Sequence, residues 1–413
     1  MKKFLAVFAV LVAVCLSSIA LAADVTVGGA VSIRSRDFND MKYNKNDHSA
    51  DQVDTQERII LDVNAKADGV KGKISIWNDF DTWGRLETLQ GTAIGSGPTG
   101  TTVASPTTIG IREAWINFNV PGLPLNVNVG HQFLQLGNGW FLRNKHFGSD
   151  AWVVANVTGN NTAAVVNIKV AEGKSAFGGD DADAYAFLDV FKLSDTAMVG
   201  FDFADVRVRP GLELQNVSLN FNGKLGPLNL MAQGDKQFGK VTGGATEPKF
   251  DGWEAVVQGN VALDPVAINF LVGQGSGKKS TDTDNKQYVN FLDIDPHYTF
   301  LYEYKLVTAA GAKNTGLSNT RVLSAGVAFD ASKSLKLGID FFNLAAAVKI
   351  KNGQGEESDD VGNEIDAKIY WKLYDNLAWN WDFGYFMPGK AFKTAAGTTD
   401  AAMGATGILT FKF

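Results

Sequence analysis

Few residue patterns in this chain could support catalysis or hold a cofactor. The stretch from Gly95 to Gly100 spells G-x-G-x-x-G, but the sequence predicts neither a strand leading into it nor a helix after it. The letters GKKS at 277–280 resemble a phosphate-binding loop without its spacing or its helix. No serine stands in a G-x-S-x-G context that would indicate a nucleophile. We therefore expect no enzyme, no catalytic residue and no cofactor.

Metal chemistry has equally little support in the sequence. The four histidines are widely scattered, and no two of them have the helical or hairpin spacing of zinc ligands. They are His48, His131, His146 and His297. The single cysteine, Cys15, lies in the leader described next, so the remaining chain is expected to have no disulfide and no thiolate site.

The first 22 residues are typical of a cleaved secretory signal peptide. Two lysines after Met1 are followed by an apolar run from Phe4 to Ile19 and by the small residues of Ala20-Leu21-Ala22. Without Lys2 and Lys3 the chain has 38 − 2 = 36 basic against 44 acidic residues, a net charge of −8, which does not favour nucleic acid as a partner. No later window of about 18 apolar residues predicts a membrane-spanning helix. We expect residues 23–413 to form one exported domain.

Period-two alternation of apolar and polar residues dominates the exported part. It runs from Leu125 to Val129, from Val217 to Asn222, from Glu364 to Leu373 and from Leu377 to Tyr385. Such alternation indicates strands with one apolar and one polar face. No stretch shows a convincing helical period. The fold class is therefore all-β.

The connections between predicted strands alternate between short turns, such as those predicted at Asp68-Gly69 and Asp295-Pro296, and long polar loops. This alternation is typical of a transmembrane up-and-down antiparallel β-barrel. We count 20 candidate strands and expect an even number between 16 and 20. Aromatic residues near strand ends, such as Tyr298, Phe300, Tyr302 and Tyr304 in one predicted strand, would form interfacial girdles. The alternative is that these rings form the core of a large soluble β-protein.

The chain closes on GATGILTFKF, with Leu409, Phe411 and Phe413 on one face of a strand and Thr410 and Lys412 on the other. We expect this strand to pair with the stretch from Val25 to Ser35 and so close the barrel.

Over its whole exported length the chain resembles the Gram-negative outer-membrane porins, on the strength of the leader, the alternating strands and the terminal GILTFKF. The stretch from Arg112 to Phe141 is more weakly similar to alginate-export-like barrels, although His131 replaces their basic residue. The resemblance implies an outer-membrane homotrimer surrounded by lipid and lipopolysaccharide. It also implies that the barrel-assembly machinery recognises Leu409, Phe411 and Phe413.

A barrel of this size holds water, and its polar face lines the pore. From the alternating faces of the predicted strands we expect eleven charged residues on the polar face. The alternative is that they are simply hydrated in the lumen and have no role in selectivity. They are Arg34, Asp62, Lys66, Lys73, Glu113, Glu303, Lys305, Glu364, Asp366, Lys368 and Lys372.

A long inward-folded loop should narrow the channel, as the resemblance implies. The candidates are the segments from Asp81 to Thr107 and from Gln135 to Asp150, the second of which offers Trp140, Arg143, Lys145 and His146. Acidic clusters at 180–183 and 356–360 would face outward, where they could bind divalent cations or remain solvated.

The sequence favours a general diffusion porin for small hydrophilic solutes and ions, with a mild cation preference because of its net negative charge. Three alternatives stay open: a specific channel for an acidic sugar or carboxylate, which needs a ladder of cations; an adhesive barrel without an open pore; and a barrel enzyme, which lacks a visible nucleophile and base.

Overall fold

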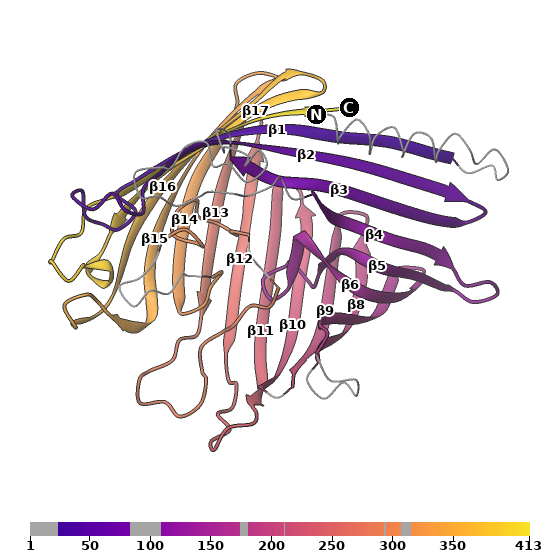
Figure 1. Ribbon diagram of the computed structural model, residues 1–413, viewed down its shortest axis with the longest axis horizontal. Helices are drawn as coiled ribbons and strands as arrows, with labels where there is room; N and C mark the ends of the chain where they lie inside the picture. The colour runs from indigo at the N-terminus through magenta and orange to yellow at the C-terminus, as the bar shows by residue number, and fades with distance from the viewer. Residues whose placement is uncertain (1–23, 83–108, 174–180, 210, 293–294, 307–314) are drawn as a thin grey trace, which may run out of the picture.

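The computed structural model describes residues 24–82, 109–173, 181–209, 211–292, 295–306 and 315–413. Eighteen strands account for almost all regular structure in these ranges, and the one helical element is the short turn η1 (Lys390–Phe392) (Figure 1). The first nine strands are β1 (Asp24–Asn39), β2 (Gln52–Ala67), β3 (Val70–Thr82), β4 (Ile109–Asn119), β5 (Leu125–Gln135), β6 (Arg143–Thr158), β7 (Asn161–Ala171), β8 (Ala182–Ser194) and β9 (Ala197–Val208). The others are β10 (Leu212–Leu225), β11 (Leu228–Val241), β12 (Trp253–Leu263), β13 (Val266–Gly275), β14 (Thr320–Asp330), β15 (Leu335–Lys351), β16 (Glu357–Tyr374), β17 (Leu377–Pro388) and β18 (Ala402–Lys412).

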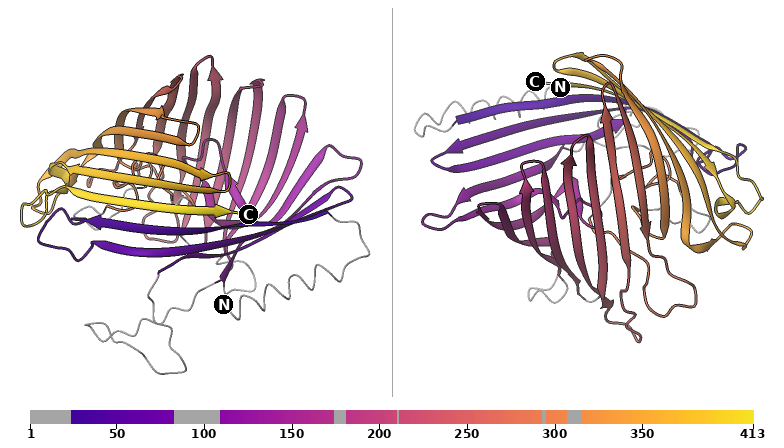
Figure 2. Two further views of the ribbon diagram at one scale, coloured as in Figure 1. Left: turned by 90° about the horizontal axis from the view of Figure 1, so that it is seen from above. Right: turned by 180° about the vertical axis from the view of Figure 1, so that it is seen from behind.

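Each strand pairs antiparallel with the next, and β18 returns to pair with β1, so the sheet closes on itself (Figure 2). The closing register runs from Ala30 opposite Lys412 to Asn39 opposite Met403. Closure leaves no edge strand in the described sheet, which is the condition for a β-sheet in lipid. The all-β barrel and its closing strand pair, both predicted from the sequence, are confirmed.

The last residue is part of this seam. The Phe413 nitrogen donates to the Gly29 carbonyl over 3.1 Å, and the Gly29 nitrogen donates to the Phe413 carbonyl over 3.0 Å. The rings of Phe411 and Phe413 stack with centroids 6.1 Å apart and are 41% and 58% exposed. A Cβ atom at Gly29 would lie 2.2 Å from the Ile60 carbonyl oxygen of β2 and 2.9 Å from the Phe413 ring, so the backbone approach here requires glycine.

The connections differ at the two ends of the barrel. At one end they are short, as at Asp68-Gly69, whose positive φ angles of 44° and 83° suit a two-residue hairpin turn. At the other end they include the long segments 40–51, 242–252, 276–319 and 389–401. The sequence predicted this alternation of short turns and long loops. The short turn predicted at Asp295-Pro296 is wrong, because both residues lie within the long β13–β14 loop.

The two faces of the wall differ in polarity. Large exposed apolar side chains such as Ile74, Trp152, Leu219 and Leu323 project on the outer face. Buried polar side chains and two apolar clusters lie on the inner face, where loops pack against the wall. The apolar core of this protein is therefore inside the barrel, beneath the inward loops. Among the described residues, no helix is long and apolar enough to cross a membrane.

Candidate functional site

Two loops from the long-loop end fold into the barrel, and the first is the β5–β6 loop, residues 136–142. The Asn138 backbone nitrogen donates to Gln233 Oε1 over 2.8 Å. Its side-chain nitrogen donates to the carbonyls of Phe221 and Ala232, at 3.2 and 2.9 Å. These partners belong to β10 and β11, so the loop crosses the interior and docks on a distant part of the wall.

The second inward loop joins β13 to β14, and residues 295–306 form its innermost described part. The Glu303 carboxylate accepts from the backbone nitrogens of His297, Tyr298 and Thr299 over 2.9, 2.7 and 3.2 Å. Three charge-assisted hydrogen bonds to one carboxylate fix a tight turn at the tip of this segment. Glu303 is fully buried. Its predicted position as a charge facing the pore water is wrong, because its carboxylate holds the loop backbone.

Two carboxylates of β16 attach this loop to the wall. Glu364 accepts from the backbone nitrogens of Leu301 and Tyr302 over 2.6 and 2.9 Å. Asp366 accepts from the Phe300 nitrogen over 2.9 Å. Both acids face the interior as parity predicted, but the loop covers them and neither is exposed. They act as anchors of the constriction rather than as charges on its surface.

The aromatic residues of this loop correct another prediction. Tyr298 and Tyr302 are buried inside the barrel and pack with Phe342, Phe386 and Phe392 of the wall and of η1. The predicted girdle strand at 298–304 is therefore wrong. Apolar residues at alternate positions occur both in a strand and in a folded loop that buries one side, so the pattern alone does not distinguish the two.

The two inward loops also bind each other. The Trp140 ring stacks on His297 with centroids 4.3 Å apart, and His297 Nε2 lies 3.1 Å from the Gly139 carbonyl. Arg143 donates to the carbonyls of Asp295 and Pro296 over 2.6 and 3.2 Å. The loops thus form one partition across the lumen, to which Trp140 and Arg143 both contribute, and their role as constriction residues stays a prediction.

The other predicted constriction residues have different positions. His146 lies on β6, where its Nε2 is 2.9 Å from Asp79 and its ring contacts Trp77. Lys145 is exposed. The alternative constriction segment, 81–107, lies almost entirely outside the described residues.

One side of the lumen carries a row of arginines over aromatic rings. Arg34 and Arg58 both lie over Phe80, with their central carbons 3.5 and 3.8 Å from the ring centroid. Arg112 lies over Phe133 at 4.6 Å and near Trp77 at 5.5 Å. These residues come from β1, β2 and β4, so the row crosses neighbouring strands. Cation–π contacts of this kind orient the guanidinium groups without neutralising them.

The arginines of this row differ in their charge partners. Arg58 is ion-paired with Asp79, and Arg36, farther along β1, with Asp54 at 2.6 Å. Arg34 donates to the neutral side chain of Gln56 over 3.0 Å. Within the described part of the chain, neither Arg34 nor Arg112 has a carboxylate at ion-pair distance.

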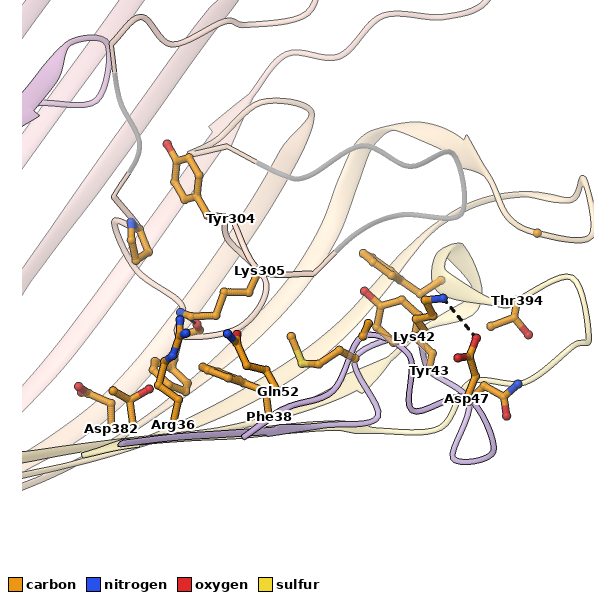
Figure 3. A pocket seen from close by; sticks show the side chains of 18 of the residues that line it. Arg36, Phe38, Lys42, Tyr43, Asp47, Gln52, Tyr304, Lys305, Asp382 and Thr394 are labelled. Carbon is orange, nitrogen blue, oxygen red and sulfur yellow. Dashed lines mark hydrogen bonds and ion pairs between the residues drawn. The ribbon is translucent and has the colours of Figure 1, made fainter. Parts of the chain in front are cut away.

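A cavity of about 1120 Å³ lies between Arg34 and Arg36 of β1, the second inward loop and the long-loop end (Figure 3). Its lining combines cations, acids and rings. They include Arg34, Arg36, Lys42, Lys305, Asp47, Asp382, Phe38, Phe300 and Tyr304. In Figure 3 the nitrogen-bearing ends of Arg36 and Lys305 point into the same part of the cavity.

Lys305 is the cation that the loop contributes to this cavity. Its ammonium lies 4.2 Å from the centroid of Phe300 and donates to the Phe300 carbonyl. Burial lowers the pKa of Lys305 below its ordinary value, and the carboxylates of Glu364 and Asp366 oppose that shift. Lys305 lines this cavity from a loop and not from a strand, and its predicted place in the pore stays a prediction.

The remaining predicted pore residues lie on the wall. Lys73 is paired with Glu113 and lies 3.7 Å from Asp62, so these three form one ion cluster on β2–β4. Lys368 lies 3.8 Å from Asp340. Lys372 is paired with Asp375 at a short turn, and Lys66 is exposed near the same end. The large cavity is lined by none of these predicted pore residues on β2–β4 and β16. These are Asp62, Lys66, Lys73, Glu113, Lys368 and Lys372.

Sequence reasoning missed Arg36, Arg58 and Arg112. Arg36 has the same parity as Arg34, and Arg58 lies opposite Ser32 on the same face, so both could have been found. Arg112 falls at a register shift between β3 and β4, where one extra residue changes the side of the sheet that a side chain faces. Parity alone does not detect such a bulge.

The acidic clusters are partly ion-paired. Lys169 lies 2.6 Å from Asp181 and 3.2 Å from Asp183, and Lys393 lies 3.6 Å from Glu356. Elsewhere in the described residues, Asp40, His48 and Asp51 of the β1–β2 loop bring potential metal ligands within 4.8 Å of one another. His48 Nδ1 is already 2.7 Å from Asp51, and exposed groups often gather in this way without an ion.

Comparison with protein-family models finds no match, and neither does comparison with curated proteins. Solved structures match over almost the whole chain. A BenF-like porin from Pseudomonas fluorescens Pf-5 has a TM-score of 0.58 at 10% identity, with 94% of this chain and 98% of that chain covered. OpdK of Pseudomonas aeruginosa, solved with vanillate, has 0.58 at 9%, with 94% and 98% covered.

A third structure, OccK2 (OpdF) of Pseudomonas aeruginosa in complex with glucuronate, has a TM-score of 0.57 at 10% identity, with 95% of this chain and 96% of that chain covered. At these identities the likeness concerns the fold alone. The chain therefore has the fold of outer-membrane porins, as its sequence predicted. The weaker resemblance to alginate-export-like barrels stays a prediction.

Proposed function

We propose that this protein is an outer-membrane channel that passes small anionic solutes, chiefly carboxylates. The observation that carries the proposal is the row of Arg34, Arg58 and Arg112 beside the partition formed by the two inward loops. The porin fold, the apolar outer face and the interior divided by loops support the location and the channel activity. The proposal adopts the substrate-specific alternative rather than a general diffusion porin.

Arginine suits this role because its planar guanidinium offers paired N–H donors that match a carboxylate. Arg34 and Arg112 have no carboxylate at ion-pair distance among the described residues, so their charge is available to a solute. The rings of Phe80, Phe133 and Trp77 beside them would pack against an apolar or aromatic part of the same solute.

The net charge of −8 led us to expect a mild cation preference, whereas the arginine row leads us to propose the opposite preference. Charges at a constriction act at contact distance, whereas exposed loop charges are screened over a Debye length of about 8 Å at physiological salt. The cations beside the partition should therefore affect ion selectivity more than the net charge of the surface does. Two of the similar structures were solved with vanillate and glucuronate, which are both carboxylates, and this supports a preference for anionic solutes.

The test is block of single-channel current by benzoate in planar bilayers, comparing the wild type with Arg34→Gln/Arg112→Gln. We expect the apparent affinity for benzoate to fall at least about tenfold, because hydrogen bonds to charged groups contribute about 1.5–3 kcal/mol. Lys372→Gln is the matched control, since it removes one cation at the short-turn end. Equal affinity in the wild type and the double variant would overturn the proposal.

A further inference from the structure

The partition separates the large cavity from a second one. This second cavity has a volume of about 340 Å³ and shares no lining residue with the first. Pro296, Phe300 and Lys305 of the second inward loop line the large cavity, whereas His297 and Tyr298 line the smaller one. The two cavities therefore lie on opposite sides of the same loop segment.

The smaller cavity lies toward the short-turn end of the barrel. Asn222 and Asn229 flank the turn between β10 and β11, and both line it. The large cavity is instead bordered by residues of the β1–β2 and β17–β18 loops at the other end. A solute that crosses the channel would meet the arginine row first from one end and the smaller cavity first from the other.

The lining of the smaller cavity is rich in amides and poor in charge. Its amide side chains are Asn222, Asn229, Gln258, Asn260 and Asn269, on four consecutive strands, β10 to β13. Ser324 and Asp340 add a hydroxyl and one carboxylate, which lies 3.8 Å from Lys368. The rest of the lining is mostly apolar and includes the rings of Phe270, Tyr298 and Phe342 and the side chains of Leu230, Met231 and Leu271.

The amides are only partly used by the protein itself. Asn229 donates to Asn260 over 2.8 Å, and Asn269 donates to Asp340 over 3.2 Å. Each amide group has two N–H donors and an oxygen with two acceptor sites, so one such bond leaves most of its capacity available. A hydroxyl group both donates and accepts, which makes a row of amides on adjacent strands complementary to a solute with several hydroxyls.

We propose that this amide-lined cavity is a second binding subsite, which takes the hydroxyl groups of a polyhydroxylated solute. The inference rests on the proposed channel function and deepens it, because a solute that uses both cavities carries a carboxylate and several hydroxyls. The arginine row holds the acid group on one side of the partition, and the amides hold hydroxyls on the other. Two moderate sites in series keep binding weak enough for release.

The subsite is tested with a neutral sugar, so that the arginines play no part. Glucose-induced block of the ionic current would be measured for the wild type and for Asn229→Leu/Asn260→Leu, with a fall of about fivefold or more in apparent affinity expected. The control is Asn117→Leu/Asn126→Leu, an amide pair bonded over 2.7 Å on β4 and β5, outside this cavity. Its glucose affinity should stay within twofold of the wild type.

Unchanged glucose affinity in the first double variant, or an equal loss in the control, would overturn the subsite. Heat-modifiable migration on gels shows whether each barrel has folded, and Gln258→Leu gives an independent variant if the double one has not. Loss of benzoate block in the arginine variant with normal glucose block would support the channel and the subsite separately. Normal benzoate block there, with impaired glucose block in the asparagine variant, would overturn the arginine proposal alone.

Discussion

At the scale of single residues, the charges of this barrel divide into those that hold an inward loop and those that we propose to face a solute. Glu303, Glu364 and Asp366 accept backbone N–H groups of the second inward loop, whereas Arg34 and Arg112 lie over aromatic rings of the inner wall. The sequence predicts most of these residues for the interior. It does not distinguish the two roles, because parity reports the face of a strand and not what a distant loop places over it.

Glu303→Gln tests the structural role of that carboxylate. The amide has about the same size but loses the negative charge that three backbone nitrogens share, and bonds to charged groups are worth about 1.5–3 kcal/mol against about 1 for neutral ones. We expect a looser loop, larger single-channel conductance and faster trypsin cleavage after Lys305. Glu113→Gln, on the wall, should change neither cleavage nor conductance by more than a small fraction. Identical cleavage rates in both variants would refute this role.

Lys305 should give the anion preference a dependence on pH. Because burial lowers its pKa, it loses its proton at a lower pH than an exposed lysine does. Its positive charge is therefore lost earlier than that of an exposed lysine as the pH rises, so anion preference should weaken toward alkaline pH. Zero-current potentials measured over pH 7–11 would show this, and Lys305→Ala should lack that part of the change. A preference that strengthens with pH would contradict the assignment.

At the scale of elements, period-two alternation predicts the strands well because every strand separates lipid from water. The predicted pairing of the last strand with the first is confirmed for this reason: Leu409, Phe411 and Phe413 alternate through to the final residue. Alternation fails at 298–304, where the loop is held by Glu364 and Asp366 from more than sixty positions away. It also fails at the bulge that carries Arg112. Long-range anchors and bulges leave no local sequence pattern.

Deletion of Phe413 tests both the seam and the predicted assembly signal. The deletion removes two backbone hydrogen bonds to Gly29 and the stacked ring on the outer face. We expect a clear fall in the folded, heat-modifiable fraction inserted into membranes, whereas barrels that do insert keep the wild-type conductance. Phe413→Tyr retains the backbone bonds and the ring and serves as control. Normal insertion of the deletion variant would show that the seam does not need its last residue.

At the scale of the whole molecule, a closed barrel of eighteen strands has a lumen too wide for the wall side chains to fill, so loops define the passage. The partition places a cation-rich cavity toward the long loops and an amide-rich cavity toward the short turns. The homotrimer implied by the family resemblance stays a prediction, which triplet conductance steps would support. The passage of a hydroxylated acid that we propose would account for the different polarity of the two cavities.

The central claim is tested most directly by the zero-current potential of the wild-type protein in a planar bilayer across a tenfold potassium chloride gradient. The arginine row beside the constriction predicts a potential whose sign corresponds to chloride permeating faster than potassium, despite the net charge of −8. A potential of the opposite sign would contradict the account, and would instead fit the cation preference expected from composition.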